Sequence, residues 1–205
     1  MKNPVAITEI IQIIRSLGFS PKGTCLYKTS ADQRVIQMVF VQPGRTHLAG
    51  KFTIGLGSFL PSVYQVRRSQ SPPPFPDISK CQIVSRLPIF AGGEDTWWNS
   101  NSPEIAAELL PVIQAHVPRF FEQWGEVSSI LQSWQRAGEE TERLRVRVSE
   151  FSIAALLHEE HRDEDARRVL ERMYVNLQGT QKDLSLIHEF AHKLGFSLNI
   201  SAAQS

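Results

Sequence analysis

Apolar residues change their spacing along the chain, and these changes divide it into helical and extended parts. Between residues 5 and 17 they recur every three or four positions, which predicts an N-terminal helix that Gly18 ends. The next part is rich in β-branched and aromatic residues interrupted by Gly, Pro, Asp and Asn, as is typical of strands with tight connections. The predicted strands cover residues 24–29, 34–41, 51–60 and 81–87. Their close succession predicts an antiparallel sheet.

Helical spacing returns after residue 102 and continues almost to the end of the chain. Apolar residues from Ile105 to Trp124 form one stripe, and Pro111 and Pro118 are expected to kink or split this helix. Three further helices are predicted, at residues 140–160, 162–177 and 181–194. Because the connections between them are short, these helices are expected to be antiparallel neighbours.

One helix, then strands, then helices predict the α+β class. The expected architecture is an antiparallel sheet flanked by the N-terminal helix and the following helix, with a C-terminal antiparallel helical bundle. We expect an α+β domain at residues 1–136 and a helical extension at residues 139–205 that packs on this domain or on a partner. Gly55 and Gly57 share one face of their strand, which leaves room there for a bulky neighbour.

Composition narrows the classes of partner. The 205 residues carry 22 Lys and Arg against 21 Asp and Glu, and this net charge of +1 gives no electrostatic reason to expect nucleic acid or an anionic membrane. No apolar run approaches the roughly 20 residues of a membrane-spanning helix, and the first residues do not resemble a signal peptide. We therefore expect a cytoplasmic protein in which Cys25 and Cys81 are free, buried and unreactive thiols.

The sharpest chemical pattern is His-Glu-Phe-Ala-His at residues 188–192. On a helix, His188 and His192 lie one turn apart and can share a zinc ion, with Glu189 as the general base of a hydrolase. A catalytic zinc ion needs a third protein ligand, and the residues after His192 include no His, Asp, Glu or Cys. His158 and His161 are the candidates for that ligand.

The pattern of residues around 188–192 is also typical of an ordinary amphipathic helix, and we prefer this interpretation. Phe190 and Ala191 lie on its apolar side, while the two histidines of the motif lie at or beyond the edge of that side. Glu189 precedes Lys193 by four residues, the favoured order for an ion pair on a helix surface. Gly195 then ends the helix. No cofactor is expected, and a zinc-dependent hydrolase is kept as an alternative.

A second candidate site lies around two adjacent tryptophans, Trp97 and Trp98. Neighbouring residues point in different directions on any regular element, so one indole can pack in the core while the other faces a groove or a partner. Asp95 precedes the pair, and Arg86 is expected to form an ion pair with it. These four residues are the predicted binding residues. The alternative is structural: the indoles fill the seam between sheet and helix, and Asp95 caps a turn.

Several short motifs occur in an order that resembles the bacterial domain-of-unknown-function family 4304, over about residues 5–125. They are Leu17-Gly-Phe19, the strand with Tyr27, Phe52-Thr-Ile-Gly-Leu-Gly57 with Leu60-Pro61, Cys81 to Leu87, and Asp95-Thr-Trp-Trp98. The resemblance implies a small cytosolic α+β protein of bacteria, and it also suggests single-domain immunity proteins, which neutralise a toxin by binding it. It brings no established activity, and the C-terminal helical part lies outside it.

These observations favour a non-enzymatic protein-binding module. The expected partner is another protein, with a toxin that the module occludes as the specific hypothesis, rather than nucleic acid or a membrane. Two alternatives remain: a zinc-dependent hydrolase that uses residues 188–192, and a small-ligand-binding domain in which Trp97 or Trp98 lies against a pocket.

Overall fold

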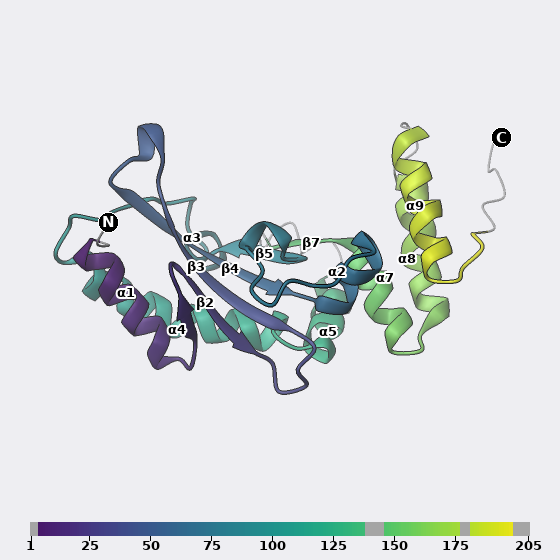
Figure 1. Ribbon diagram of the computed structural model, residues 1–205, viewed down its shortest axis with the longest axis horizontal. Coiled ribbons are helices and arrows are strands. Elements are labelled where there is room, and N and C mark those ends of the chain that lie inside the picture. The colour runs from purple at the N-terminus through teal and green to yellow at the C-terminus, as the bar shows by residue number, and fades with distance from the viewer. Residues whose placement is uncertain (1–3, 138–145, 177–180, 199–205) are drawn as a thin grey trace. The chain divides into compact units, whose positions relative to one another are not determined.

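The computed structural model describes residues 4–137, 146–176 and 181–198 (Figure 1). The chain forms two compact units, each described here by itself. The sheet unit contains residues 1–61 and 72–147, and the helical unit contains residues 62–71 and 148–205. The predicted α+β class is confirmed. The main part of the helical unit begins at residue 148. The unit also includes residues 62–71, which follow the predicted strand at 51–60, and the sequence did not indicate this contribution.

The sheet has the strand order β1-β2-β3-β4-β5-β7, and β6 pairs with β4 beyond this path. Pairing is antiparallel from β1 through β5 and between β4 and β6. The predicted strands are confirmed to within two residues at each end. The strands are β1 (Ser20–Lys22), β2 (Cys25–Thr29), β3 (Ile36–Pro43), β4 (Lys51–Phe59), β5 (Ile83–Arg86), β6 (Trp98–Asn99) and β7 (Arg147–Val148).

The inner face of the sheet is covered by two helices, α1 (Val5–Ser16) and α4 (Ile105–Trp124), which pack on each other and on the strands. Gln37 on β3 donates a 3.1 Å hydrogen bond to the carbonyl of Gly125, and Ser58 on β4 donates to the carbonyl of Trp124. The C-terminal end of α4 is therefore tied to the sheet through carbonyls that have no partner within the helix. The buried side chains of this layer include Ile10, Ile14, Leu26, Val39, Ile54, Leu56, Val117 and Phe120.

Pro111 and Pro118 do not split α4, which runs as one helix of 20 residues. Pro111 is exposed and Pro118 is partly exposed, so both proline rings lie toward the outer side of the helix. The carbonyls that lose a backbone partner belong to residues 107 and 114, which are also exposed. Because these carbonyls can bind water, the missing hydrogen bonds cost too little to end the helix.

The remaining short elements of the sheet unit connect these layers. They are the 3₁₀ turns η1 (Thr46–Leu48) and η2 (Ile78–Lys80), and the helices α3 (Leu87–Phe90) and α5 (Val127–Ala137).

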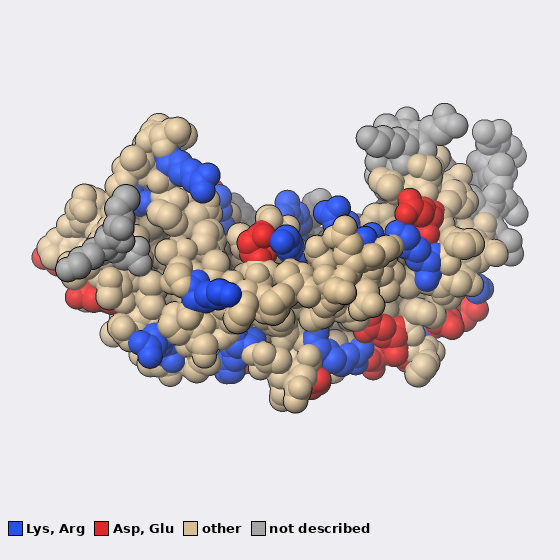
Figure 2. Space-filling view, viewed as in Figure 1, with Lys and Arg blue, Asp and Glu red and all other residues tan. Residues whose placement is uncertain are grey.

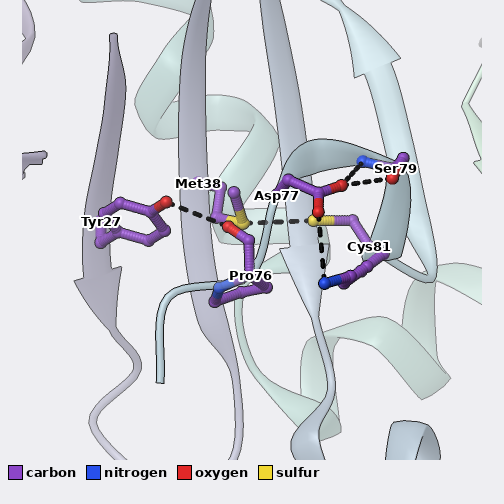
Figure 3. A network of polar contacts seen from close by, with 7 residues as sticks. Tyr27, Met38, Pro76, Asp77, Ser79 and Cys81 are labelled. Atoms are coloured by element: carbon purple, nitrogen blue, oxygen red, sulfur yellow. Dashed lines mark hydrogen bonds and ion pairs between the residues drawn. The ribbon is translucent and has the colours of Figure 1, made fainter. Parts of the chain in front are cut away.

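The outer face of the sheet is covered in part by the proline-rich segment at residues 72–82, here called the covering segment. Tyr27 donates a 3.0 Å hydrogen bond to the carbonyl of Pro76, and the thiol of Cys81 lies 3.3 Å from the sulfur of Met38 (Figure 3). Asp77 begins η2 by accepting a hydrogen bond from the Ser79 amide. The covering segment is thus held over β2, β3 and β4 by contacts of Pro76, Ile78 and Cys81.

Gly57 is the position on β4 that makes room for the covering segment. A Cβ atom there would lie 2.5 Å from Cδ1 of Ile78 and 2.9 Å from Sγ of Cys81. At Gly55, by contrast, the nearest side-chain atom would be 3.8 Å away, an ordinary contact. The bulky neighbour that was predicted beside Gly55 and Gly57 is therefore the covering segment, which approaches Gly57 most closely.

The helical unit contains α2 (Pro61–Arg68, from residue 62), α7 (Glu150–Glu159), α8 (Asp163–Asn176) and α9 (Gln181–Lys193). Helix α7 packs on α8, and α8 packs on α9. The buried side chains include Ile153, Leu156, Leu157, Ala166, Val169, Leu170, Ile187, Phe190 and Leu194. The C-terminal helices that the sequence predicted are present, but the first predicted one begins only at residue 150, and residues 138–145 lie outside the described part.

We expect Gly57→Ala to destabilise the sheet unit by about 1–3 kcal/mol, because its methyl group overlaps Cys81 and the covering segment must shift. The matched variant Gly55→Ala has space for the methyl group and is expected to be much closer to the wild type. Urea denaturation followed by circular dichroism measures both. Equal losses in the two variants would show that the covering segment does not depend on the bare backbone at Gly57.

Candidate functional site

The first candidate site lies on the outer face of the sheet, where Arg86 ends β5 opposite Gly55 of β4. Nη1 of Arg86 lies 2.7 and 2.8 Å from the two carboxylate oxygens of Asp95. The guanidinium carbon lies 5.2 Å from the centroid of the Trp97 ring, within the range of a cation–π contact. The predicted pair of Arg86 with Asp95 is therefore present, and Trp97 joins it. We call these three residues the Arg86 patch.

The other predicted residue, Trp98, points elsewhere. It forms β6 and pairs with Phe52 of β4, with ring centroids 5.7 Å apart. Phe52 is fully buried, so this indole belongs to the packing of the sheet unit. Two adjacent tryptophans thus face in different directions, as their positions in the sequence predicted. Of the two, Trp97 is the one that lies beside a charged and partly exposed pair.

The His-Glu-Phe-Ala-His motif forms part of the helix α9. His188 and His192 are exposed, whereas Ile187, Phe190 and Ala191 are buried. The Lys193 ammonium lies 2.9 Å from the Glu189 carboxylate, the ion pair that the sequence predicted.

Backbone hydrogen bonds end the helix α9 at Gly195, as the sequence predicted. The amide of Phe196 donates to the carbonyl of Ala191, and that of Gly195 donates to His192. Gly195 has a φ of 77°, a left-handed conformation that glycine adopts without strain. The interpretation of the segment as a packed amphipathic helix is confirmed.

The candidates for a third zinc ligand have other contacts. Nδ1 of His158 lies 2.7 Å from the Asp163 carboxylate, and its ring meets the edge of Phe196. His161 lies in the connection between α7 and α8, with a φ of 58°. Among the described residues, no group of three His, Cys, Asp or Glu side chains is placed to hold a metal ion. The expected third ligand for His188 and His192 is not brought to them.

Cys25 and Cys81 are free thiols. Cys25 lies on the outer face of β2, and Cys81 belongs to the covering segment and faces Gly57 on the outer face of β4. Burial raises the pKa of the Cys81 thiol, and the negative charge of Asp77 raises it further. Burial also raises the pKa of Cys25, against an opposing hydrogen bond from Tyr27. Both residues are partly rather than fully buried, which corrects the expectation of buried thiols. Their raised pKa values still make them poor nucleophiles at neutral pH.

A cavity of about 400 Å³ opens where α1 ends beside β2 and α4. Leu17, Phe19 and Phe121 form part of its apolar wall, and Lys28 and Glu122 lie on its polar side. Neither Trp97 nor Trp98 lines this cavity. Binding of a small ligand stays a prediction, and the cavity lies away from the tryptophans that were expected to form its site. Sequence reasoning missed this cavity, because its walls come from segments that lie about 90 residues apart.

A comparison with protein families places these features in context. The family model described as Domain of unknown function (DUF4304) matches residues 11–124. The chain belongs to this family. The DUF4304 match includes α1 from Ile11 onward, the strands from β1 to β6, the Arg86 patch and most of the wall of the cavity, and it excludes α7, α8 and α9. No curated protein and no solved structure matches the chain.

The sequence predicted a resemblance over about residues 5–125, which the match confirms. Among the described residues, no helix combines the length and the apolar character needed to cross a membrane.

We expect both thiols to react slowly with a thiol reagent such as DTNB at pH 8, because burial keeps them protonated in the folded protein. Unfolding in urea should release both at the rate of an ordinary thiol. Since the folded-state pKa values are raised, the stability that the thiols contribute is present below their unfolded pKa and is lost as the pH rises above it. Rapid labelling of native Cys81 in a Cys25→Ser variant would contradict this account.

Phe190 and the histidines of the motif should differ sharply in their contribution to stability. We expect Phe190→Ala to lower the free energy of unfolding of the helical unit by about 3 kcal/mol, because the ring is buried against Phe151. His192→Ala should change it by less than about 0.5 kcal/mol, because the side chain is exposed. Urea denaturation measures both variants. Metal analysis is the companion experiment: stoichiometric zinc that is lost in His188→Ala would overturn the structural interpretation of the motif.

Proposed function

We propose that the DUF4304 part of the chain is a non-enzymatic protein-binding module and that the Arg86 patch is its contact surface. The observation that carries the proposal is the preformed arrangement of a guanidinium held by both oxygens of Asp95 and set against an indole. Tryptophan and arginine are the residues on which binding energy at protein interfaces is most often concentrated. No other described group of residues in this part combines the two.

The geometry of the patch lowers the cost of binding. A free arginine side chain loses rotamer freedom when it enters an interface, and this loss weakens the complex. Here the contacts with Asp95 and Trp97 already restrict Arg86 in the unbound protein. The Arg86 and Asp95 side chains still expose 33% and 48% of their surface, so a partner can reach them.

Charge supports a protein partner rather than a polyanion. Asp95 neutralises Arg86 within the patch, so the patch carries no net positive charge to attract phosphates. On the face drawn in Figure 2, the acidic and basic side chains of the described residues are interspersed. Affinity would therefore come from burial of the indole and from hydrogen bonds, and it should depend only weakly on salt. The more specific hypotheses, a toxin as the partner and a cytoplasmic location, stay predictions.

The proposal predicts that Trp97→Ala abolishes the capture of a protein partner and that Arg86→Lys weakens it about tenfold. Lysine keeps the charge but loses the planar group that binds both oxygens of Asp95 and stacks on the indole. The immobilised wild-type chain and its variants are exposed to a lysate of the source cells, captured proteins are identified by mass spectrometry, and their affinities are then measured by calorimetry.

Leu110→Ala is the matched control, because Leu110 is a 37% exposed apolar residue of α4 outside the patch. It should capture the same partner as the wild type. Unfolding midpoints of all variants identify any loss of binding that comes from misfolding. A partner bound equally well by folded Trp97→Ala and by the wild type would refute the assignment of this surface.

A further inference from the structure

The helical unit has a groove of about 200 Å³ formed by α2, which lies within the DUF4304 match, and by α7 and α9, which lie outside it. Its floor is aromatic: the rings of Phe151 and Phe190 meet edge to face with centroids 4.9 Å apart. Leu186 stands on the rim with 48% of its surface exposed. A soluble protein that exposes an apolar residue beside an aromatic floor has a surface suited to a large apolar side chain of a partner.

The rim of the groove is cationic. Arg67, Arg68 and Lys193 line it, and Glu189 is the one acidic residue among the lining residues described. Glu189 is already paired with Lys193 at 2.9 Å. The groove therefore presents two guanidinium groups that this glutamate does not neutralise.

Neither arginine forms an ion pair with a carboxylate of the described residues. The Arg67 guanidinium instead lies 5.5 Å from the centre of the Phe151 ring and 3.4 Å from the hydroxyl of Ser149. Burial and, to a smaller extent, the charge of Arg68 lower the pKa of Arg67. Two adjacent cations, one of them held over the aromatic floor, form a site that a carboxylate would stabilise.

We propose that this groove binds an acidic segment of a partner protein that carries a large apolar side chain. The apolar side chain lies on Phe151 and Phe190, beside Leu186, and flanking carboxylates of the segment pair with Arg67 and Arg68. The proposal does not rest on the function assigned to the Arg86 patch. It also explains the position of Glu189, which holds Lys193 at the rim rather than activating water.

The overall charge of the unit favours a short acidic segment over a membrane or nucleic acid. Residues 62–71 and 148–205 contain eight Lys and Arg against nine Asp and Glu, so the unit as a whole does not attract a polyanion. The first turn of α8 is acidic at Asp163, Glu164 and Asp165. Arg67, Arg68 and Lys193 are thus a local group of cations in a unit without net positive charge, which matches a ligand of a few residues.

The test uses the full chain and a fluorescent peptide of about twelve residues with one leucine flanked by glutamates, followed by fluorescence polarisation. We expect saturable binding that weakens as salt is raised. A peptide with glutamine in place of glutamate, and one with serine in place of leucine, should each bind at least about tenfold more weakly.

Arg68→Gln and Arg168→Gln form a matched pair, because each removes one exposed cation of the helical unit and only Arg68 lines the groove. Arg68→Gln is expected to weaken peptide binding about tenfold, and Arg168→Gln is expected to leave it within about twofold. Leu186→Ser tests the apolar contact and should weaken binding without a change in the salt dependence.

Three results would overturn the proposal. They are no saturable binding at peptide concentrations up to about 1 mM, equal losses in Arg68→Gln and Arg168→Gln, and equal binding of the glutamate and glutamine peptides. Vesicles of phosphatidylcholine with phosphatidylserine provide the membrane comparison. Binding to these vesicles that is lost in Arg68→Gln, with no binding of the acidic peptide, would assign the groove to a lipid surface instead.

Discussion

Strand β4 is buried on both faces, and the rest of the sheet unit depends on this constraint. Its inner face packs under α4, while its outer face meets the covering segment at residues 72–82. At Gly57 the covering segment approaches the backbone of β4 so closely that any side chain there would force it away. The glycine leaves the space that Ile78 and Cys81 occupy. The close approach of the covering segment to β4 depends on this absent side chain, and the burial that raises the pKa of the Cys81 thiol accompanies it.

The alternation of side chains along strands also creates the Arg86 patch. Arg86 lies opposite Gly55, on the outer face, and its side chain reaches Asp95 and Trp97 from there. Trp98, one residue further, pairs with Phe52 and is used for packing. A single residue of offset therefore separates an indole that stabilises the fold from one that lies beside a charged pair.

The helix α9 shows how a motif of catalytic appearance can be accounted for by packing. Its buried residues hold it in the helical unit, and the chain turns back at Gly195 through two backbone hydrogen bonds. Glu189 lies on the rim of the cationic groove with Lys193, while His188 meets the ring of Tyr174. The polar residues of the motif thus belong to two different surroundings, whereas a metal site requires them to converge on one point.

Local interactions could be predicted from the sequence, because they depend on residues within one or two turns of backbone. The strands, the helix at the end of the chain, the pair of Glu189 with Lys193 and that of Arg86 with Asp95 are of this kind. The cavity and the cationic groove depended on the tertiary structure. Arg67 and Ser149, for example, lie 82 positions apart and meet because α2 packs in the helical unit rather than with its neighbouring strands. The spacing of residues along a chain sets which face each one occupies, but only the packing of distant segments decides which faces meet.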